Sequence, residues 1–437
     1  MKTDSPHGVA ESWLPRQRSF LAAVVGALLA ALLPSAVSAA PGDLDPTFSS
    51  DGKVTTNLSG GDQLANAVAV QASDGKIVVA GRVGGRGGRF GLARYSADGA
   101  LDTSFGSAGT VITNFGPGDD VPFGIAIQSS DGKIVAAGTA AFRRFAVARY
   151  NPDGSLDGTF GGDGTVTTNT THDLDIGFDV AIQPADLKVV VAGTVGGAGG
   201  RLAAIRYNGD GSLDMTFSSD GQALINFTRG FDTAFDVAIQ PTDQRIVAAG
   251  TSGGRGGRTF AVARFNTDGT LDASFDADGR VTTDFGPGID HVDGVAIQSS
   301  NGAIVAGGHT EVGGGRFALA RYNANGTLDR SFNTDGKATT NFTRRSDGGL
   351  GVVLQPSDGK IVIGGFAAGG GGRFALARYT PEGALDTGFS SDGKVMVNFT
   401  RGDDFVNDVV LQPSDGKVVA VGTAGLGKFA LARFLAT

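Results

Sequence analysis

The chain alternates short apolar runs with polar turns, and this pattern recurs along most of its 437 residues. In one copy, the apolar runs Gly351–Gln355 and Lys360–Gly365 flank Pro356–Gly359, whose Asp-Gly pair is a strong β-hairpin signal. A glycine-rich segment then leads to Arg373–Tyr379, where side chains alternate with the period of two that is typical of a strand. A fourth apolar run, Lys394–Phe399, completes the copy, so each copy is predicted to form four β-strands.

A second phrase, Leu-Asp-x-x-Phe, recurs at intervals of 55 to 58 residues, with its Leu-Asp pairs beginning at Leu44, Leu101, Leu156, Leu213, Leu271, Leu328 and Leu385. A fixed period of this size indicates a repeat architecture. Four strands per unit, no helical periodicity and seven units predict an all-β fold, a seven-bladed β-propeller with four antiparallel strands per blade. The alternative is an open stack or β-helix, which would need distinct capping units; the sequence shows none.

The two ends of the repeat array complement each other. The first copy begins with Leu44-Asp45 and a strand at Lys53–Leu58, before any hairpin, whereas the last copy ends at Phe434 after its third strand. We therefore predict that the N-terminal strand completes the last blade and closes the ring, which removes exposed sheet edges.

Most hairpin turns carry Asp-Gly or Asn-Gly. Two copies lack the glycine, at Asp186-Leu187 and Asp243-Gln244, and their turns are predicted to be looser.

The repeated phrases also resemble a known family. The segment Gln355–Gly365, followed by Phe374–Tyr379 and by Gly383–Asp386, resembles the delta-60 repeat of bacterial, often exported, proteins. The resemblance covers Leu44 to the C-terminus. The hairpin half is similar to NHL-type propeller repeats, in which such a hairpin forms the two inner strands. The resemblance implies a blade and implies no catalytic residue.

Residues 1–40 lie outside the repeats. Arg16 and Arg18 precede an apolar run, Phe20–Leu33, which is followed by small residues, the order of a secretory signal with cleavage after Ala39 or Ala40. A membrane anchor is the alternative, but the run is shorter than the roughly 20 residues that cross a bilayer. We expect residues 1–40 to be a signal peptide and residues 41–437 a single propeller domain. The expected location is secreted, extracellular or at the cell surface, or periplasmic in a cell with an outer membrane, with no stable membrane span.

Composition narrows the function classes. The chain has no cysteine, which excludes disulfides and thiol chemistry. Its net charge of −8 argues against a nucleic-acid partner, because phosphate binding needs a basic surface. The remaining partners are an unknown protein or an extracellular polymer, and the chain is expected to be a monomer.

One arginine and one aspartate recur in every copy. An arginine on a packed strand must be paired, because a lone buried charge is very costly. We expect ion pairs, within a blade or between adjacent blades, among Arg94, Arg149, Arg206, Arg264, Arg321, Arg378 and Arg433 and Asp102, Asp157, Asp214, Asp272, Asp329, Asp386 and Asp45. A ring of arginines that binds an anion is the functional alternative.

Metal sites are weakly indicated. The segment Asn151–Asp157 invites a calcium interpretation, but it has few acids and no glutamate, and turn chemistry explains its Asn, Asp and Gly residues. His172 and His291 each lie among aspartates, but they are two copies apart, and with His309 they form no ligand-spaced cluster. We therefore expect no metal and no cofactor, with calcium as the alternative.

Function is expected where the copies differ. The loops after the second strand are rich in glycine and arginine, the loops before the first strand are often acidic, and both should open on one rim of the propeller. The candidate binding residues there are Arg86, Arg89, Asp119, Asp120, His172, Asp173, Arg255, Arg258, Asp290, His291, Asp293, Arg373, Asp403 and Asp404. The five tyrosines occupy one repeat position, so none is left for a binding surface.

These observations favour a non-enzymatic, secreted or surface-associated scaffold that binds a ligand or partner on this rim. The alternative is an exported hydrolase or lyase that acts on extracellular polymers with aspartates of the variable loops. No Gly-x-Ser-x-Gly nucleophile motif is present, and no catalytic residue is assigned.

Overall fold

The computed structural model describes residues 39–436, except residues 142, 172, 255, 256, 344, 369–371 and 426. The predicted signal peptide lies outside the described residues, apart from its last two positions. Residues Ala40–Thr437 form one compact unit. In the part of the chain that the structure describes, no helix is long and apolar enough to span a membrane.

Nearly all of the regular structure is β-strand, in seven four-stranded antiparallel sheets. Blade 1 contains β2 (Leu64–Val70), β3 (Ile77–Val83), β4 (Arg89–Tyr95) and β5 (Thr110–Thr113). Blade 2 contains β6 (Asp120–Ile127), β7 (Ile134–Ala140), β8 (Arg144–Tyr150) and β9 (Thr165–Thr168). Blade 3 contains β10 (Asp175–Ile182), β11 (Val189–Val195), β12 (Arg201–Tyr207) and β13 (Gln222–Ile225), with a short 3-10 helix, η1 (Gly197–Gly199). Blade 4 contains β14 (Phe231–Ile239), β15 (Ile246–Gly254), β16 (Gly257–Phe265) and β17 (Arg280–Thr283).

The other three blades follow the same plan. Blade 5 contains β18 (Asp290–Ile297), β19 (Ile304–Thr310), β20 (Arg316–Tyr322) and β21 (Lys337–Thr340). Blade 6 contains β22 (Asp347–Leu354), β23 (Ile361–Ala368), β24 (Gly372–Tyr379) and β25 (Lys394–Val397). Blade 7 contains β26 (Asp404–Leu411), β27 (Val418–Ala424), β28 (Lys428–Phe434) and, from the other end of the chain, β1 (Lys53–Thr56).

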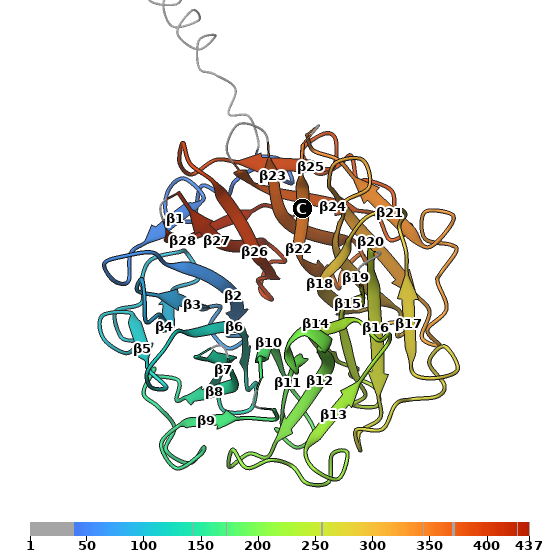
Figure 1. The fold of residues 1–437 in the computed structure, drawn as a ribbon. Coiled ribbons are helices and arrows are strands. Elements are labelled where there is room, and N and C mark those ends of the chain that lie inside the picture. Colours follow the sequence, from blue (N-terminus) through green and yellow to red (C-terminus); the bar gives the residue numbers. More distant parts are fainter. Residues whose placement is uncertain are drawn as a thin grey trace, which may run out of the picture. The chain divides into compact units, whose positions relative to one another are not determined.

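The sheets are arranged in a ring around a common centre (Figure 1). In each blade the first strand is innermost, and the innermost strands of neighbouring blades contact one another, including β26 with β2. The predicted seven-bladed propeller is therefore confirmed.

Ring closure follows the prediction as well. Strand β1 pairs antiparallel with β28, from Lys53 opposite Ala432 to Thr56 opposite Phe429. The seventh blade is thus built from both ends of the chain, and the outer edge of β28 is covered.

Apolar side chains fill the space between neighbouring sheets, and one polar contact recurs within this core. The hydroxyl of Tyr322 lies 2.8 Å from Thr283 Oγ1, which belongs to the outermost strand of the preceding blade. All five tyrosines are buried and make this contact, so none reaches the surface.

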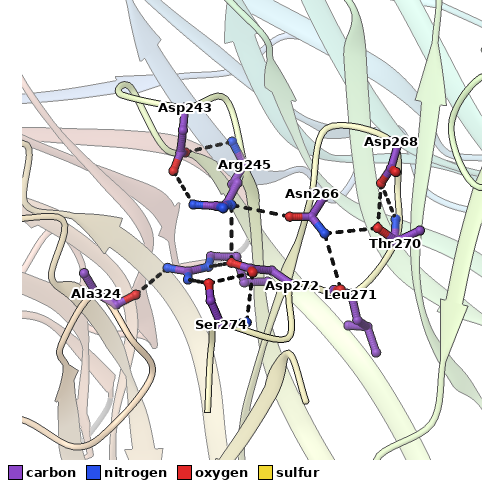
Figure 2. Close-up of polar contacts among 10 residues, drawn as sticks. Asp243, Arg245, Asn266, Asp268, Thr270, Leu271, Asp272, Ser274 and Ala324 are labelled. Carbon is purple, nitrogen blue, oxygen red and sulfur yellow. Dashed lines mark hydrogen bonds and ion pairs between the residues drawn. The ribbon is translucent and has the colours of Figure 1, made fainter. Parts of the chain in front are cut away.

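The Leu-Asp-x-x-Phe phrase forms a second link between blades (Figure 2). In blade 4, Arg264 Nε donates to Asp272 Oδ2 at 2.7 Å, and Nη1 donates to the carbonyl of Ala324 in blade 5 at 2.5 Å. The guanidinium carbon lies 4.7 Å from the ring centroid of Phe275. The buried arginine is thus paired with a carboxylate, bonded to the next blade and stacked on a phenyl ring.

The same arrangement occurs in all seven blades. Each of the recurrent arginines forms an ion pair with the aspartate of its Leu-Asp phrase, at 2.6 to 2.8 Å: Arg94 with Asp102, Arg149 with Asp157, Arg206 with Asp214, Arg264 with Asp272, Arg321 with Asp329, Arg378 with Asp386 and Arg433 with Asp45. The last of these pairs joins the two ends of the chain.

The prediction of looser turns at Leu187 and Gln244 is wrong. Both residues adopt left-handed backbone angles, with φ of 59° and 61°, close to the 72° of Gly359 in the equivalent turn of blade 6. Their amides donate to the carbonyls of Gln183 and Gln240 at 2.9 Å, the bond that Gly359 makes with Gln355 at 2.8 Å. The turn geometry is therefore the same as in the glycine-containing copies. Leu187 and Gln244 adopt a left-handed backbone conformation that is unfavourable for residues with a side chain.

Candidate functional site

We call one end of the propeller the rim face: it is formed by the loops before the innermost strands and the loops between the second and third strands. These two kinds of loop contact each other. Asp119 accepts hydrogen bonds from the amides of Gly87 and Gly88 at 2.7 Å and lies 3.3 Å from Arg82. In the same way, Asp403 accepts a bond from the amide of Gly372 at 2.7 Å. Acidic and glycine-rich loops therefore share one face.

Three acids that the sequence placed among the binding residues are structural. Asp120, Asp290 and Asp404 are at most 1% exposed. Each accepts a hydrogen bond at 2.8 Å from the backbone amide of the phenylalanine in its own loop, Phe115, Phe285 and Phe399 respectively. Asp175, Asp232 and Asp347 are buried at the same position of other blades. Because these carboxylates hold the loops in place and are closed to solvent, we exclude them from the binding surface.

The other predicted rim residues are more accessible. Arg86, Arg89, Asp173 and Asp403 are exposed, whereas Arg258 and Arg373 are half-buried. His172 and Arg255 lie outside the described residues.

A wider basic pattern emerges at the rim face. Six blades carry a basic residue five positions before the paired arginine, at the start of the third strand: Arg89, Arg144, Arg201, Arg316, Arg373 and Lys428. We call these six residues the basic ring. Blade 4 has Thr259 at this position and Arg258 beside it. Among the described residues, none of the six forms an ion pair.

Of the basic ring, only Arg89 and Arg373 were predicted from the sequence, because that prediction was based on arginines in glycine-rich loops. The constant spacing of five residues from the recurrent arginine was the signal that could have revealed the rest.

The centre of the propeller holds a second candidate site. Every innermost strand has a β-bulge, a one-residue shift in its pairing with the second strand. A bulge redirects the extra side chain. The bulged residues are Asn66, Phe123, Phe178, Phe235, Asp293, Leu350 and Asn407, and all except Leu350 line a cavity of about 120 Å³.

The wall of this cavity differs from one side to the other. The rings of Phe123, Phe178 and Phe235 line one side and follow one another with centroids 4.7 to 5.3 Å apart, and the ring of His291 lies 4.7 Å from that of Phe235. On the other side, the amide of Asn407 donates to the carbonyl of Ala65 in the adjacent blade at 2.7 Å. This row of aromatic rings could not be predicted from the sequence, because its members resemble ordinary strand residues.

Three further acids lie beside the bulges. Asp408 accepts bonds from its own neighbour, Val409, at 2.7 Å and from Val68 of the next blade at 2.9 Å. Burial raises the pKa of Asp408 to about 7. Burial also raises the pKa of Asp179 well above its ordinary value, with repulsion from the adjacent Asp236 as the second cause. These carboxyls therefore hold protons in a pH range where exposed aspartates are ionised.

The expectation that the histidines do not cluster is wrong for two of them. His291 and His309 face each other across strands β18 and β19 of one blade. Their Nδ1 atoms lie 3.3 and 3.2 Å from the carboxylate of Asp293. Copy-to-copy spacing did not reveal this pair, because it depends on cross-strand register within a blade.

Comparison with known families finds matches to the repeats. Six segments match the model of a family described as a domain of unknown function (DUF5122) beta-propeller: residues 72–105, 129–160, 185–217, 242–275, 299–332 and 357–389. Every match begins in a hairpin turn and ends at the phenylalanine of the Leu-Asp-x-x-Phe phrase. No curated protein matches the chain.

Solved structures share the fold at low sequence identity. A hydrazine synthase structure from Kuenenia stuttgartiensis is 12% identical, with a TM-score of 0.54 over 87% of this chain and 97% of that one. Sqt1 of Chaetomium thermophilum, bound to the N-terminus of the ribosomal protein L10, is 11% identical, with a TM-score of 0.49 over 86% of this chain and 98% of that one. At these identities, the likeness to the first structure extends to the fold alone.

Proposed function

We propose that the protein is a non-enzymatic binding scaffold, secreted or held at the cell surface, whose rim face binds an anionic extracellular polymer. The observation that carries the proposal is the basic ring: six blades present a cation at one position, without an ion pair among the described residues, on a chain of net charge −8.

We call the opposite end of the propeller, which carries the hairpin turns, the hairpin face. In the described part of the chain, its lysines, unlike the residues of the basic ring, form ion pairs. There, Lys76 lies 3.3 Å from each of two carboxylates, Asp74 and Asp102. Lys133, Lys188, Lys360 and Lys417 likewise each lie near two carboxylates. Cations on the hairpin face are thus neutralised locally, whereas those of the basic ring are left to interact with a partner.

The distribution of the charges favours a polymer over a small anion. The six cations belong to six different blades, so only an extended ligand can contact several of them at once. Additional exposed arginines in the rim loops, Arg86, Arg229, Arg345 and Arg401, widen the same surface. A cationic surface of this kind attracts polyanions at a distance and loses affinity as salt screens the charges.

Export is part of the proposal and rests on the apolar run Phe20–Leu33 and the small residues that follow it. Fractionation of the producing cells and N-terminal sequencing of the exported protein test it. We expect the protein outside the cytoplasm, with a new terminus after Ala39 or Ala40. A protein that stays in the cytoplasm with residues 1–40 intact would contradict this part.

The binding proposal is tested by titrating the tag-free protein with dextran sulfate, a carboxylated polysaccharide, DNA and uncharged dextran. We expect binding to the anionic polysaccharides that weakens with added salt, and no binding to dextran. The Arg89→Ala/Arg144→Ala double variant should bind about tenfold more weakly, since an exposed ion pair contributes up to about 1 kcal/mol.

Arg280→Ala is the matched control, because this half-buried arginine is already paired with Asp278 at 2.7 Å. Equal binding of dextran and dextran sulfate would refute the proposal, and so would full affinity in the double variant. Following polymer length during the titration tests the alternative of a hydrolase or lyase. Turnover that disappears in Asp173→Asn or Asp293→Asn would favour that alternative.

A further inference from the structure

Three donor side chains of blade 5 lie close together, and one of them, Asp293, lines the central cavity. His291 on β18 and His309 on β19 are cross-strand partners, and their rings stack at 5.2 Å with an interplanar angle of 11°. Asp293 is the bulged residue of β18, and its carboxylate lies 3.3 Å from His291 Nδ1 and 3.2 Å from His309 Nδ1. The side chains are 16 to 27% exposed, so solvent and ions can reach them.

The distances among the donors suit a metal ion better than a direct hydrogen bond. The Nδ1 atoms of His291 and His309 lie 3.3 and 3.2 Å from Asp293 carboxylate oxygens, and one donor atom from each residue lies within 4.8 Å of the others. A charge-assisted N–H···O bond is shorter, about 2.7 to 2.9 Å. Ligands placed tetrahedrally on a metal at about 2.0 Å are separated by about 3.3 Å.

The cavity that Asp293 lines offers no competing cation, because no lysine or arginine is among its described lining residues. The donor set is confined to blade 5. The pairs equivalent to His291–His309 in neighbouring blades are Thr233–Thr251 and Gly348–Phe366. Since the repeat framework does not require these residues, they point to a function of this blade alone.

We infer that His291, Asp293 and His309 bind one divalent transition-metal ion of the zinc class at the central cavity. Two imidazoles and a carboxylate are a donor set that suits Zn²⁺. Three protein donors leave a coordination position for water or for a ligand in the cavity.

The test uses the purified, tag-free protein after treatment with a chelator, titrated with Zn²⁺ by calorimetry and with Co²⁺ by visible absorption. We expect one ion per chain and the Co²⁺ spectrum of a tetrahedral site. Asp293→Asn, His291→Gln and His309→Gln should each weaken Zn²⁺ binding at least tenfold and abolish the Co²⁺ spectrum. Zn²⁺ should also raise the melting temperature of the parent protein but not of these variants.

Glu311→Gln is the control, because it removes an acid two residues from His309 that is not one of the three donors. It should retain Zn²⁺ affinity within about twofold. The inference is refuted if the parent binds no Zn²⁺, or if all three donor variants bind it as the parent does. Circular dichroism identifies a variant that fails to fold, and the remaining donor variants then decide. Polymer binding by the rim face is measured separately, so the two proposals can fail independently.

Discussion

At the scale of single residues, Arg264 shows how a charge is kept inside a blade. The residue is 3% exposed, and its guanidinium contacts Asp272, a backbone carbonyl and the face of Phe275. Removing one partner of such a buried pair leaves the other charge buried without a counter-charge. This typically lowers the free energy of unfolding by about 3 to 5 kcal/mol. The repeated Arg, Asp and Phe therefore stabilise the packing of neighbouring blades. A ligand could bind these residues only by displacing their buried contacts.

Gln244 is a residue at which stability can be gained. Its left-handed φ of 61° costs about 1 to 2 kcal/mol for a residue with a side chain, whereas glycine costs about 0.5 to 1 kcal/mol in unfolded-state entropy. We predict that Gln244→Gly raises the free energy of unfolding by about 0.5 to 1 kcal/mol, measured by urea denaturation. The reverse change in the equivalent turn, Gly359→Gln, should lower it by a similar amount. Destabilisation by Gln244→Gly would show that the turn is not strained.

Asp408 should make stability fall as pH rises. Burial raises its pKa in the folded protein from 3.8 to about 7. Between these values the folded chain holds a proton that the unfolded chain has lost, so raising the pH through this window destabilises the folded state. Asp408→Asn cannot titrate. Its melting temperature relative to the parent should therefore rise as pH increases from about 4 to about 7. A melting-temperature difference between Asp408→Asn and the parent that stays constant over this range would contradict the prediction.

At the scale of elements, the bulged innermost strand explains a recurrent glycine. A Cβ at Gly81, Gly138, Gly193, Gly250, Gly308, Gly365 or Gly422 would lie 1.8 to 2.0 Å from a carbonyl oxygen of the adjacent innermost strand. The bulge thus brings two backbones into a contact that only glycine permits. The bulged residues of every blade except blade 6 also line the central cavity.

Gly365→Ala tests this contact. The added Cβ would meet the Gly348 oxygen at 1.9 Å, and backbone atoms cannot give way without breaking the pairing of β22 with β23. We expect the free energy of unfolding to drop by about 3 kcal/mol or more. Gly209→Ala is the control, since its Cβ would meet nothing within 4 Å. Equal effects of the two substitutions on the urea midpoint would contradict the role assigned to the bulge.

The blades could be predicted from the sequence because their signals are local. Alternating side chains and Asp-Gly turns determine strands and hairpins, and the fixed period determines the blade number. The central cavity could not be predicted in this way. A one-residue shift at Phe178 or Asp293 depends on strand pairing, and a strand pattern alone does not report it. The same holds for His291 and His309, which meet through cross-strand register.

The rim face shows a different limit. The sequence predicted which loops meet, but it could not separate the buried Asp120 from its exposed neighbours. Both kinds of aspartate occur in the same loops, and only packing shows that Asp120 is closed to solvent. The full basic ring could not be predicted from the variable loops, because its members keep a constant position in the repeat.

At the scale of the whole molecule, the ring depends on one closure. Strand β1 and Asp45 come from the N-terminal part of the chain, whereas β28 and Arg433 lie at the C-terminal end. The amide of Gly42 donates to the carbonyl of Leu435, and the amide of Leu435 to the carbonyl of Asp43. Gly383 and Thr380 make the equivalent bonds in the uninterrupted loop of blade 6. Blade 7 therefore has the structure of the other blades, except that the loop between its third and fourth strands is interrupted by the chain termini.

A circular permutant tests this account of the closure. Joining Thr437 directly to Gly42 gives Phe434-Leu-Ala-Thr-Gly-Asp-Leu-Asp45, which has the length of Tyr379–Asp386 in blade 6. New termini at Gly61 and Gly60 would make every blade from consecutive strands. We predict that this permutant folds with an unfolding midpoint close to that of the parent. Deletion of residues 41–57 should instead expose the edge of β28 and leave Arg433 buried without its carboxylate. That deletion should lower the midpoint and cause self-association in size-exclusion chromatography. A deletion variant as stable and monomeric as the permutant would show that the blades hold together without the closure.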